Sequence, residues 1–413
     1  MSSEQVMELK HFIGGQEVAG RSGRFADVYD PSTGQVQATV PLASRDEVDE
    51  VVRNAREAQV AWGATNAQKR ARVLGRFVNL ANEHADEIAE ALSREHGKTV
   101  PDSHGDLQRG LDVVEFAMGA PHLLKGEFSD SVGTGIDVYS MRQPLGVVAG
   151  ITPFNFPAMI PLWKAGPAIA AGNAFVLKPS ERDPSVPLIL ARLWKEAGLP
   201  DGIFNVVNGD KEAVDALIDH EDIRAVAFVG STPIAQSIYE HAASRGKRAQ
   251  CFGGAKNHMI VMPDADLDQA ADALIGAAYG SAGERCMAIS VAVPVGEETA
   301  DALVAKVKEK AENLTFGPSL DESSDYGPLV SSAAKERVES MIGRGVEEGA
   351  ELVLDGRGAS VAGHEEGFFV GPTLFDRVTP DMNVYREEIF GPVLTVLRAA
   401  DFDEALEPVS YTH

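Results

Sequence analysis

The chain contains only two cysteines among its 413 residues, Cys251 and Cys286. Two cysteines cannot build the disulfide framework of a small secreted domain, and they suit a reducing cytosol. Basic residues are also scarce, because 37 Lys and Arg stand against 62 Asp and Glu and leave a formal net charge of −25. A chain this acidic is a poor partner for nucleic acid or for an anionic membrane surface.

A long apolar run and a signal sequence are missing as well. The most apolar region, residues 160–177, is interrupted by Lys164, Pro167 and Asn173, so we do not expect it to span a membrane. The first residues lack the basic and apolar segments of a signal peptide. We therefore expect a cytoplasmic protein with no membrane partner, and we predict no metal site.

Short apolar runs alternate with helical patterns from Gly146 onward. The expected strands are 146–151, 174–177, 204–207 and 225–229, with helices at 157–171, 185–197, 211–220 and 232–244 between them. This alternation predicts a doubly wound, mostly parallel α/β sheet. Helical patterns at 45–62, 68–96 and 102–116 precede it.

A second alternating region begins at His258 and predicts a second α/β unit. Its expected strands are 258–262, 289–295, 351–354 and 393–397, and its expected helices are 267–279, 297–313 and 333–348. A chain of this length is expected to hold two or three domains.

Cys286 lies between a glycine-containing turn, Gly280-Ser-Ala-Gly-Glu-Arg, and the expected strand 289–295. A thiol in that position can be held at the end of a sheet, where reacting groups commonly converge. A buried structural cysteine is the alternative interpretation.

Polar residues also follow the strands of the first sheet. Lys178 and Glu181 come after the second strand, where nucleotides bind in such sheets. Glu181 would repel a 2′-phosphate, which favours NAD over NADP. The alternative for these two residues is a solvated surface pair.

The segment Phe228-Val-Gly-Ser-Thr232 joins a strand to a helix, with Ser231 or Thr232 as N-cap. Free amides at such a helix start suit a pyrophosphate, although the full Gly-x-Gly-x-x-Gly pattern is missing. A simple capping role is the alternative.

Two further side chains are candidates. Asn155 is bracketed by Pro153 and Pro157, and a rigid amide near a thiol could donate to a developing oxyanion; a turn asparagine is the alternative. Arg109 shares a helical stripe with Val113 and Phe116, so it needs an anionic partner or an exit to solvent.

The order of these motifs resembles that of the aldehyde dehydrogenase superfamily over residues 10–406. The motifs are Pro153-Phe-Asn-Phe-Pro157, Lys178-Pro-Ser-Glu181, Phe228-Val-Gly-Ser-Thr232, Gly-Glu-Arg-Cys286 and Glu387-Glu-Ile-Phe-Gly-Pro392. The resemblance implies Cys286 as nucleophile and Asn155 as oxyanion donor. It implies that NAD is bound by Thr152, Phe154, Lys178, Glu181, Gly230, Ser231, Glu388 and Phe390, the last two on the nicotinamide side.

One departure concerns the fate of the acyl group. Hydrolytic members of the superfamily carry a glutamate 34 residues before the nucleophile, where this chain has Phe252. Because phenylalanine cannot activate water, a thiol such as coenzyme A is the expected acceptor. The surrounding residues resemble the CoA-acylating methylmalonate-semialdehyde dehydrogenases, which implies that Arg109 and Arg285 hold a substrate carboxylate.

The resemblance also implies a domain plan. Residues 1–124 and 142–252 would form an NAD-binding domain, 125–141 a bridging hairpin that supports a homo-oligomer, and 253–413 a catalytic domain. The family pattern continues beyond the helix that starts at Asp401, and residues 408–413 do not resemble it. Two alternatives therefore stay open: a hydrolytic aldehyde dehydrogenase, and a truncated fragment that only binds NAD.

Overall fold

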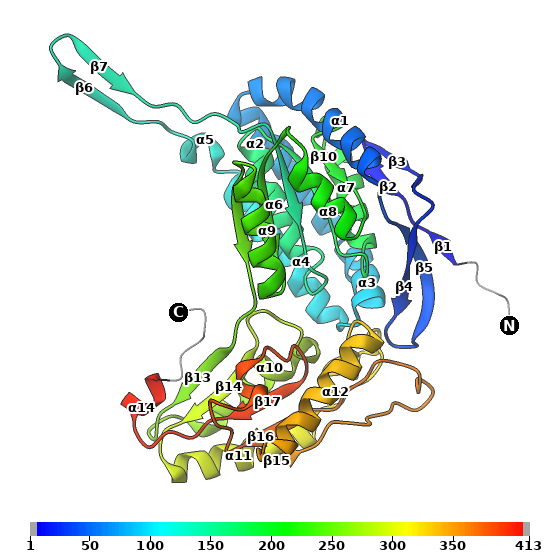
Figure 1. The fold of residues 1–413 in the computed structure, drawn as a ribbon, viewed down its shortest axis with the longest axis vertical. Coiled ribbons are helices and arrows are strands. Elements are labelled where there is room, and N and C mark those ends of the chain that lie inside the picture. Colours follow the sequence, from blue (N-terminus) through cyan, green and yellow to red (C-terminus); the bar gives the residue numbers. More distant parts are fainter. Residues whose placement is uncertain (1–5, 408–413) are drawn as a thin grey trace. The chain divides into compact units, whose positions relative to one another are not determined.

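The computed structural model describes residues 6–407, so the unusual tail at 408–413 lies outside the described residues (Figure 1). The chain divides into two compact units. The first unit comprises Met1–Val28, Val36–Ala91 and His104–Gly253, and the second comprises Tyr29–Gln35, Leu92–Ser103 and Gly254–His413. The expected boundary after residue 252 lies one residue before the observed boundary, which follows Gly253. The short stretches 29–35 and 92–103, which were expected in the first unit, belong with the second unit.

The first unit is built on a seven-stranded sheet with the order β12-β11-β8-β9-β10-β2-β3. Its strands are β2 His11–Ile13, β3 Gln16–Val18, β8 Val147–Ile151, β9 Ala174–Lys178, β10 Phe204–Val206, β11 Ile223–Val229 and β12 Arg248–Phe252. All pairs from β12 to β10 are parallel, and β2 joins antiparallel at the edge. Since the chain runs outward from β8 in both directions, the predicted doubly wound sheet is confirmed.

The burial of each strand explains why its sequence pattern did or did not predict it. Strands β8, β9 and β10 are buried at every residue, as expected for parallel strands covered on both faces. Strand β12 lies at the edge, and its residues alternate between exposed and half-buried. It therefore lacks an apolar run, and the sequence analysis missed it.

Within the described residues 6–407, nine helices lie before Gly253. They are α1 Arg45–Ala64, α2 Ala67–Glu83, α3 Ala85–His96, α4 Val100–Ala117, α5 Ala120–Leu123, α6 Met159–Ala170, α7 Ser185–Glu196, α8 Lys211–Asp219 and α9 Thr232–Ser244. The single helix expected over 68–96 is divided at His84, which caps α2 with φ −103° and ψ 17°. Ser44 and Glu47 form a capping box at the start of α1.

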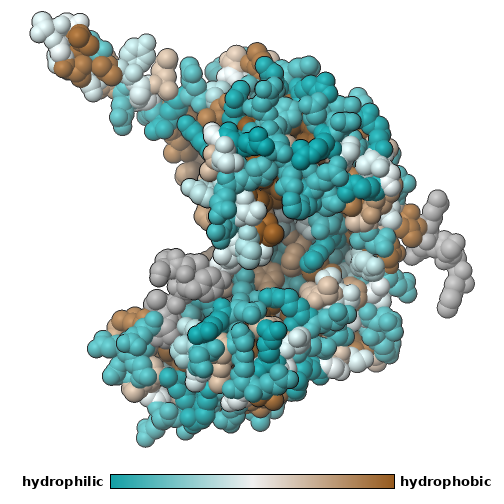
Figure 2. All heavy atoms as spheres, in the orientation of Figure 1, coloured by the Kyte–Doolittle hydropathy of each residue, from teal (hydrophilic) through white to brown (hydrophobic). Residues whose placement is uncertain are grey.

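Two smaller β structures accompany this sheet. The strands β1 Met7–Glu8, β5 Gln35–Pro41 and β4 Phe25–Asp30 form one sheet in that order. The antiparallel hairpin of β6 Phe128–Gly133 and β7 Ile136–Tyr139 projects from the first unit (Figure 1). Its exposed apolar side chains are Phe128, Val132, Ile136, Val138 and Tyr139, and the hairpin carries brown surface in Figure 2.

The second unit contains a five-stranded sheet with the order β13-β14-β17-β16-β15. Its elements are β13 Asn257–Val261, α10 Leu267–Tyr279, β14 Ile289–Pro294, α11 Glu297–Glu312, α12 Ser332–Glu347, β15 Glu351–Leu354, β16 Thr373–Asp376, α13 Asn383–Arg386, β17 Val393–Val396 and α14 Phe402–Leu406. Among the strands that the structure describes in this sheet, only β15 is antiparallel to its neighbour. Strand β16 is the one strand of this sheet that the sequence analysis missed.

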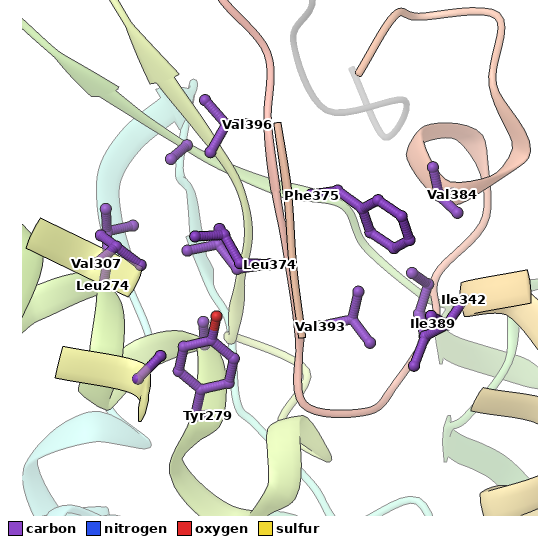
Figure 3. Close-up of a cluster of buried hydrophobic side chains, with 14 of the residues drawn as sticks. Leu274, Tyr279, Val307, Ile342, Leu374, Phe375, Val384, Ile389, Val393 and Val396 are labelled. Carbon is purple, nitrogen blue, oxygen red and sulfur yellow. The ribbon is translucent and has the colours of Figure 1, made fainter. Parts of the chain in front are cut away.

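The core of the second unit lies between its sheet and helices α10, α11 and α12 (Figure 3). Leu374 of β16 lies at its centre with Leu274 and Val396, and all three are buried. No helix of residues 6–407 is long and apolar enough to cross a membrane.

Truncation of the core should destabilise this unit. We expect Leu374→Ala to lower the free energy of unfolding by about 2–5 kcal/mol, because it removes buried apolar contacts and leaves a cavity. Urea denaturation measures the change. The matched control is Leu320→Ala, whose side chain is 37% exposed and whose loss should stay within about 0.5 kcal/mol. Equal losses in the two variants would contradict this description of the core.

Candidate active site

The carboxyl ends of neighbouring strands in the first unit meet at one edge of the sheet. Thr152 follows β8, and its N–H donates to the carbonyl of Lys178, the last residue of β9, at 3.2 Å. Gly230 follows β11, and its N–H donates to the carbonyl of Phe252, the last residue of β12, at 3.1 Å. Thr152, Lys178 and Gly230 therefore lie at the edge where ligands bind in doubly wound sheets.

Lys178 is buried, although its partner is more exposed. Its ammonium lies 3.4 Å from a carboxylate oxygen of Glu181. The side chain of Lys178 is 8% exposed and that of Glu181 is 40% exposed, so this is not the solvated surface pair of the alternative interpretation. A cation and an acceptor at a strand end fit the ribose hydroxyls of a dinucleotide.

The start of α9 has the geometry of an anion site. Ser231 is the N-cap residue, and its hydroxyl makes no capping hydrogen bond. Gly230 precedes it at a position where a Cβ atom would lie 2.4 Å from the ring of Phe228. The chain thus needs glycine there, and the first-turn amides of α9 suit a pyrophosphate.

Asn155 lies in the segment that joins β8 to α6, and this segment is fixed where it meets α6. Its side chain is buried, and the segment leads into α6 at Met159. The N–H of Met159 donates to the carboxylate of Asp106, a fully buried residue of α4, at 2.7 Å. Phe154, in the same segment, lies under the guanidinium of Arg182 at 5.2 Å from the ring centre.

Arg109 is exposed rather than embedded in an apolar stripe. Its guanidinium donates to the carbonyl of Gly105 at 3.2 Å, one turn earlier on α4. Phe116, which shares the expected stripe, is also exposed, so this face is not part of the core. The arginine can therefore meet an anion without first losing a buried partner.

The cysteine turn of the second unit has an unusual backbone. Ser281, Ala282 and Gly283 adopt φ values of 54°, 51° and 72°, which are costly for residues with a side chain. A Cβ atom on Gly283 would lie 2.0 Å from the carbonyl oxygen of Gly391. Glycine therefore allows the turn before Cys286 to approach the segment that follows Phe390.

Asn257 fixes the backbone on both sides of the thiol. Its side-chain amide donates to the carbonyl of Cys286 at 3.0 Å and to that of Ala288 at 2.8 Å. The sequence analysis gave this asparagine no role. A polar residue at the first position of a strand close to Cys286 was the available signal.

Cys286, Arg285, Glu388 and Phe390 line one pocket of the second unit. Glu388 is half-buried, and its carboxylate accepts from the N–H of Ala255 at 3.4 Å. Phe390 has φ 58°, a value that few residues other than glycine adopt. The structure thus brings four predicted site residues of this unit together, and the carboxyl-edge residues of the first unit likewise share one edge.

The electrostatics of the pocket disfavour a thiolate. Burial raises the pKa of the Cys286 thiol, and the charge of Glu388 raises it further. The ammonium of Lys98, a fully buried residue, has the opposite effect on this pKa. Burial also raises the pKa of Glu388, while Lys256 and Arg337 lower it.

Arg285 has a carboxylate partner within its own unit. Its guanidinium donates to Asp102 at 2.6 Å and to the carbonyl of Gly276 at 3.3 Å. Lys98 is a cation that lowers the pKa of Cys286 in the structure. Lys98 and Asp102 were missed because both are about 180 residues distant in sequence from the turn they act on.

These features define an α/β protein with a doubly wound sheet and a pocket that contains a half-buried thiol beside a carboxylate. The sequence pattern described as "Aldehyde dehydrogenase family" matches residues 18–412. The chain therefore belongs to the aldehyde dehydrogenase family, and the resemblance found in its motifs is confirmed.

Individual relatives are more specific. The chain is 56% identical over 402 residues to malonate-semialdehyde dehydrogenase of Pseudomonas aeruginosa, covering 97% of this chain and 81% of the relative. It is 48% identical to the mitochondrial, acylating methylmalonate-semialdehyde dehydrogenase of Arabidopsis thaliana, covering 97% of this chain and 66% of that protein.

A crystal structure from Sinorhizobium meliloti, named as a methylmalonate-semialdehyde dehydrogenase and complexed with NAD, superposes with a TM-score of 0.97. That protein is 61% identical in sequence, and the match covers 98% of this chain and 83% of that one. The predicted aldehyde dehydrogenase fold is thereby confirmed.

The reactivity of the thiol tests the site directly. In a Cys251→Ser background, we expect alkylation of Cys286 by iodoacetamide to rise with pH and to reach half its maximum above the ordinary thiol pKa of about 8.5. Glu388→Gln removes a negative charge that raises this pKa. The midpoint should therefore move to lower pH, and alkylation at pH 8 should become severalfold faster. An unchanged or higher midpoint would contradict the assigned electrostatics.

Proposed function

We propose that the protein catalyses the NAD-dependent, CoA-acylating oxidation of malonate or methylmalonate semialdehyde. The products would be acetyl-CoA or propionyl-CoA, with loss of the substrate carboxylate. The observation that carries the proposal is the pocket shared by Cys286, Glu388 and Phe390. The names of the relatives from Pseudomonas aeruginosa and Arabidopsis thaliana support the same substrate class.

The first half of the reaction forms a thioester. The Cys286 thiolate adds to the aldehyde carbon, and the side-chain amide of Asn155 and the N–H of Cys286 would donate to the resulting oxyanion. Each good donor of this kind is worth roughly 3 to 4 kcal/mol of transition-state stabilisation. NAD+, when bound at the strand ends, supplies the acceptor for the hydride that leaves this carbon. Residues Lys178, Glu181 and Ser231 would hold its adenosine and pyrophosphate groups.

The second half transfers the acyl group. Phe252 is 54% exposed at the end of β12, and its ring offers no base to activate water. The thiol of CoA then attacks the thioester carbonyl, and Cys286 leaves as a thiolate. The carboxylate lies β to the thioester carbonyl, so the bond that joins it to the α-carbon can break to release CO2, which water hydrates to bicarbonate. The electrons of that bond are held as an enolate, which then takes up a proton.

Two arginines would recognise the substrate carboxylate. Arg109 is exposed and carries a guanidinium that can form a bidentate pair with a carboxylate. Arg285 lines the pocket of the nucleophile, and Asp102 holds one of its nitrogen atoms at 2.6 Å. Asp102 and the carbonyl of Gly276 would therefore orient Arg285 and leave its other N–H groups for the substrate.

The two alternatives differ in what they predict for turnover. A hydrolytic aldehyde dehydrogenase needs a general base, and Phe252 argues against it. A fragment that only binds NAD would form no NADH at all. The chain spans 81% of the Pseudomonas aeruginosa relative, and a turnover assay distinguishes all three cases.

We further propose that the protein forms a homo-oligomer through the hairpin of β6 and β7. Exposed apolar side chains on that hairpin, including Phe128 and Ile136, support this assignment because isolated exposed hairpins are marginally stable.

We also propose a cytoplasmic location. Both cysteines are free thiols, which fits the reducing cytoplasm.

The requirement for CoA is the direct test of the reaction. With semialdehyde and NAD but without CoA, we expect NADH formation to stop after about one equivalent per Cys286, because no water is activated. Added CoA should restore continuous turnover. Phe252→Glu should add slow release of a free acid without CoA. Sustained NADH formation by the unaltered protein without CoA would instead favour the hydrolytic alternative.

The carboxylate assignment has its own test. Arg109→Leu should raise KM for malonate semialdehyde by roughly tenfold or more, since a hydrogen-bonded charge pair is lost. Propanal, which has no carboxylate, serves as the matched control substrate, and its KM should change little. Equal increases for the two aldehydes would show that Arg109 does not bind the carboxylate.

A further inference from the structure

Three consecutive residues, Ala255, Lys256 and Asn257, touch both sides of the pocket in the second unit. Ala255 donates its N–H to the carboxylate of Glu388, and Asn257 donates its side-chain amide to the carbonyl of Cys286. Lys256 lies between them and is 2% exposed. We call these three residues the junction.

The ammonium of Lys256 donates hydrogen bonds to backbone carbonyls. It donates to the carbonyl of Val384 at 2.8 Å and to that of Glu387 at 2.9 Å. These two carbonyls flank the last part of α13, directly before Glu388. The lysine therefore fixes the path of the chain on the N-terminal side of that carboxylate.

A second cation holds the same segment from α12. The guanidinium of Arg337 donates to the carbonyl of Ile389 at 2.5 Å and also to the carbonyl of Glu388. Together, Lys256 and Arg337 occupy carbonyls on both sides of the Glu388 side chain.

The apolar side chains of this segment are anchored separately. Val384 and Ile389 are buried in the core with Phe375 and Ile342 (Figure 3). Side-chain packing thus fixes the two ends of the segment 384–389. The two cations fix backbone carbonyls at these ends and also those of Glu387 and Glu388 between them. The backbone around Glu388 is held more firmly than packing alone requires.

The buried lysine is not explained by stability. Removing an ammonium from water costs several kcal/mol, and an apolar side chain of similar size is often as good or better in such a position. Burial lowers the pKa of Lys256 to about 8, an effect that Glu388 and Glu387 oppose and Arg337 reinforces. His258, whose pKa is lowered by burial, also faces Lys256 and accordingly is neutral near pH 8.

We propose that Lys256 and Arg337 are positioning residues that set the Glu388 carboxylate, relative to the Cys286 loop, for the nicotinamide end of the cofactor. This inference rests on the proposed cofactor role of Glu388. The junction would then fix the spacing between the nucleophile and the group that orients the hydride acceptor. Neither cation needs to touch the cofactor to have this effect.

The test uses Lys256→Met and Arg337→Met, with Lys308→Met as a control. Lys308 is an exposed lysine of α11 whose ion-pair partner is Glu312. Hydrogen exchange in the cofactor-free protein should accelerate about tenfold or more over residues 384–390 in both test variants, because charge-assisted hydrogen bonds are lost. Calorimetric titration should show NAD affinity reduced by a similar factor, and the control should match the unaltered protein.

The pH dependence separates positioning by Lys256 from a merely structural role. Lys256 is protonated below pH 8 and loses its charge as pH rises through that value. NAD affinity of the unaltered protein should therefore weaken across this range, and Lys256→Met should abolish that step. Arg337→Met should retain the step, because the lysine is still present.

The outcomes distinguish the two levels of the proposal. Normal exchange over residues 384–390 and normal NAD affinity in Arg337→Met would overturn the inference. Because Arg337 is exposed, we expect this variant to fold. If Glu388→Gln leaves NAD affinity unchanged, the cofactor role of Glu388 fails. In that case accelerated exchange in the cofactor-free variants still supports the contacts, and the positioning role for NAD is overturned.

Discussion

The hydrogen bonds from Asn257 to the carbonyls of Cys286 and Ala288 are the constraint on which the pocket of the second unit depends. The cysteine turn reaches this position through three residues with positive φ, a conformation that needs compensation from its surroundings. The hydrogen bonds of Asn257 contribute to it, and the lack of a side chain at Gly283 lets the turn approach Gly391 without a clash. A thiol on so constrained a turn loses little conformational freedom when it reacts.

The charges around this turn favour the protonated form of the Cys286 thiol as long as no further cation is bound nearby. Burial and Glu388 raise the pKa of Cys286, whereas Lys98 lowers it. Glu388 is a suitable neighbour for a bound nicotinamide cation, whose positive charge would lower the pKa of the same thiol. Activation of the nucleophile would thus be coupled to occupation of the cofactor site, which protects the thiol from unproductive reactions.

Local patterns predicted most of the fold but few of the contacts within the site. The apolar runs of β8 and β9 identified the sheet because buried parallel strands require them. Strand β12 is an edge strand without such a run, and it was missed for that reason. Motifs predicted Cys286 and Glu388 as site residues, whereas Lys98 and Asp102 act on a turn far away in the sequence. No local periodicity records contacts of this kind.

In the proposed reaction, Cys286 carries the acyl group until CoA accepts it. The most direct measurement is mass spectrometry of the peptide containing Cys286 after the protein has been mixed with semialdehyde and NAD, without CoA. We expect an acyl group on Cys286 that persists until CoA is added and then disappears. An unmodified Cys286 peptide in the presence of accumulating NADH and free acid would contradict it.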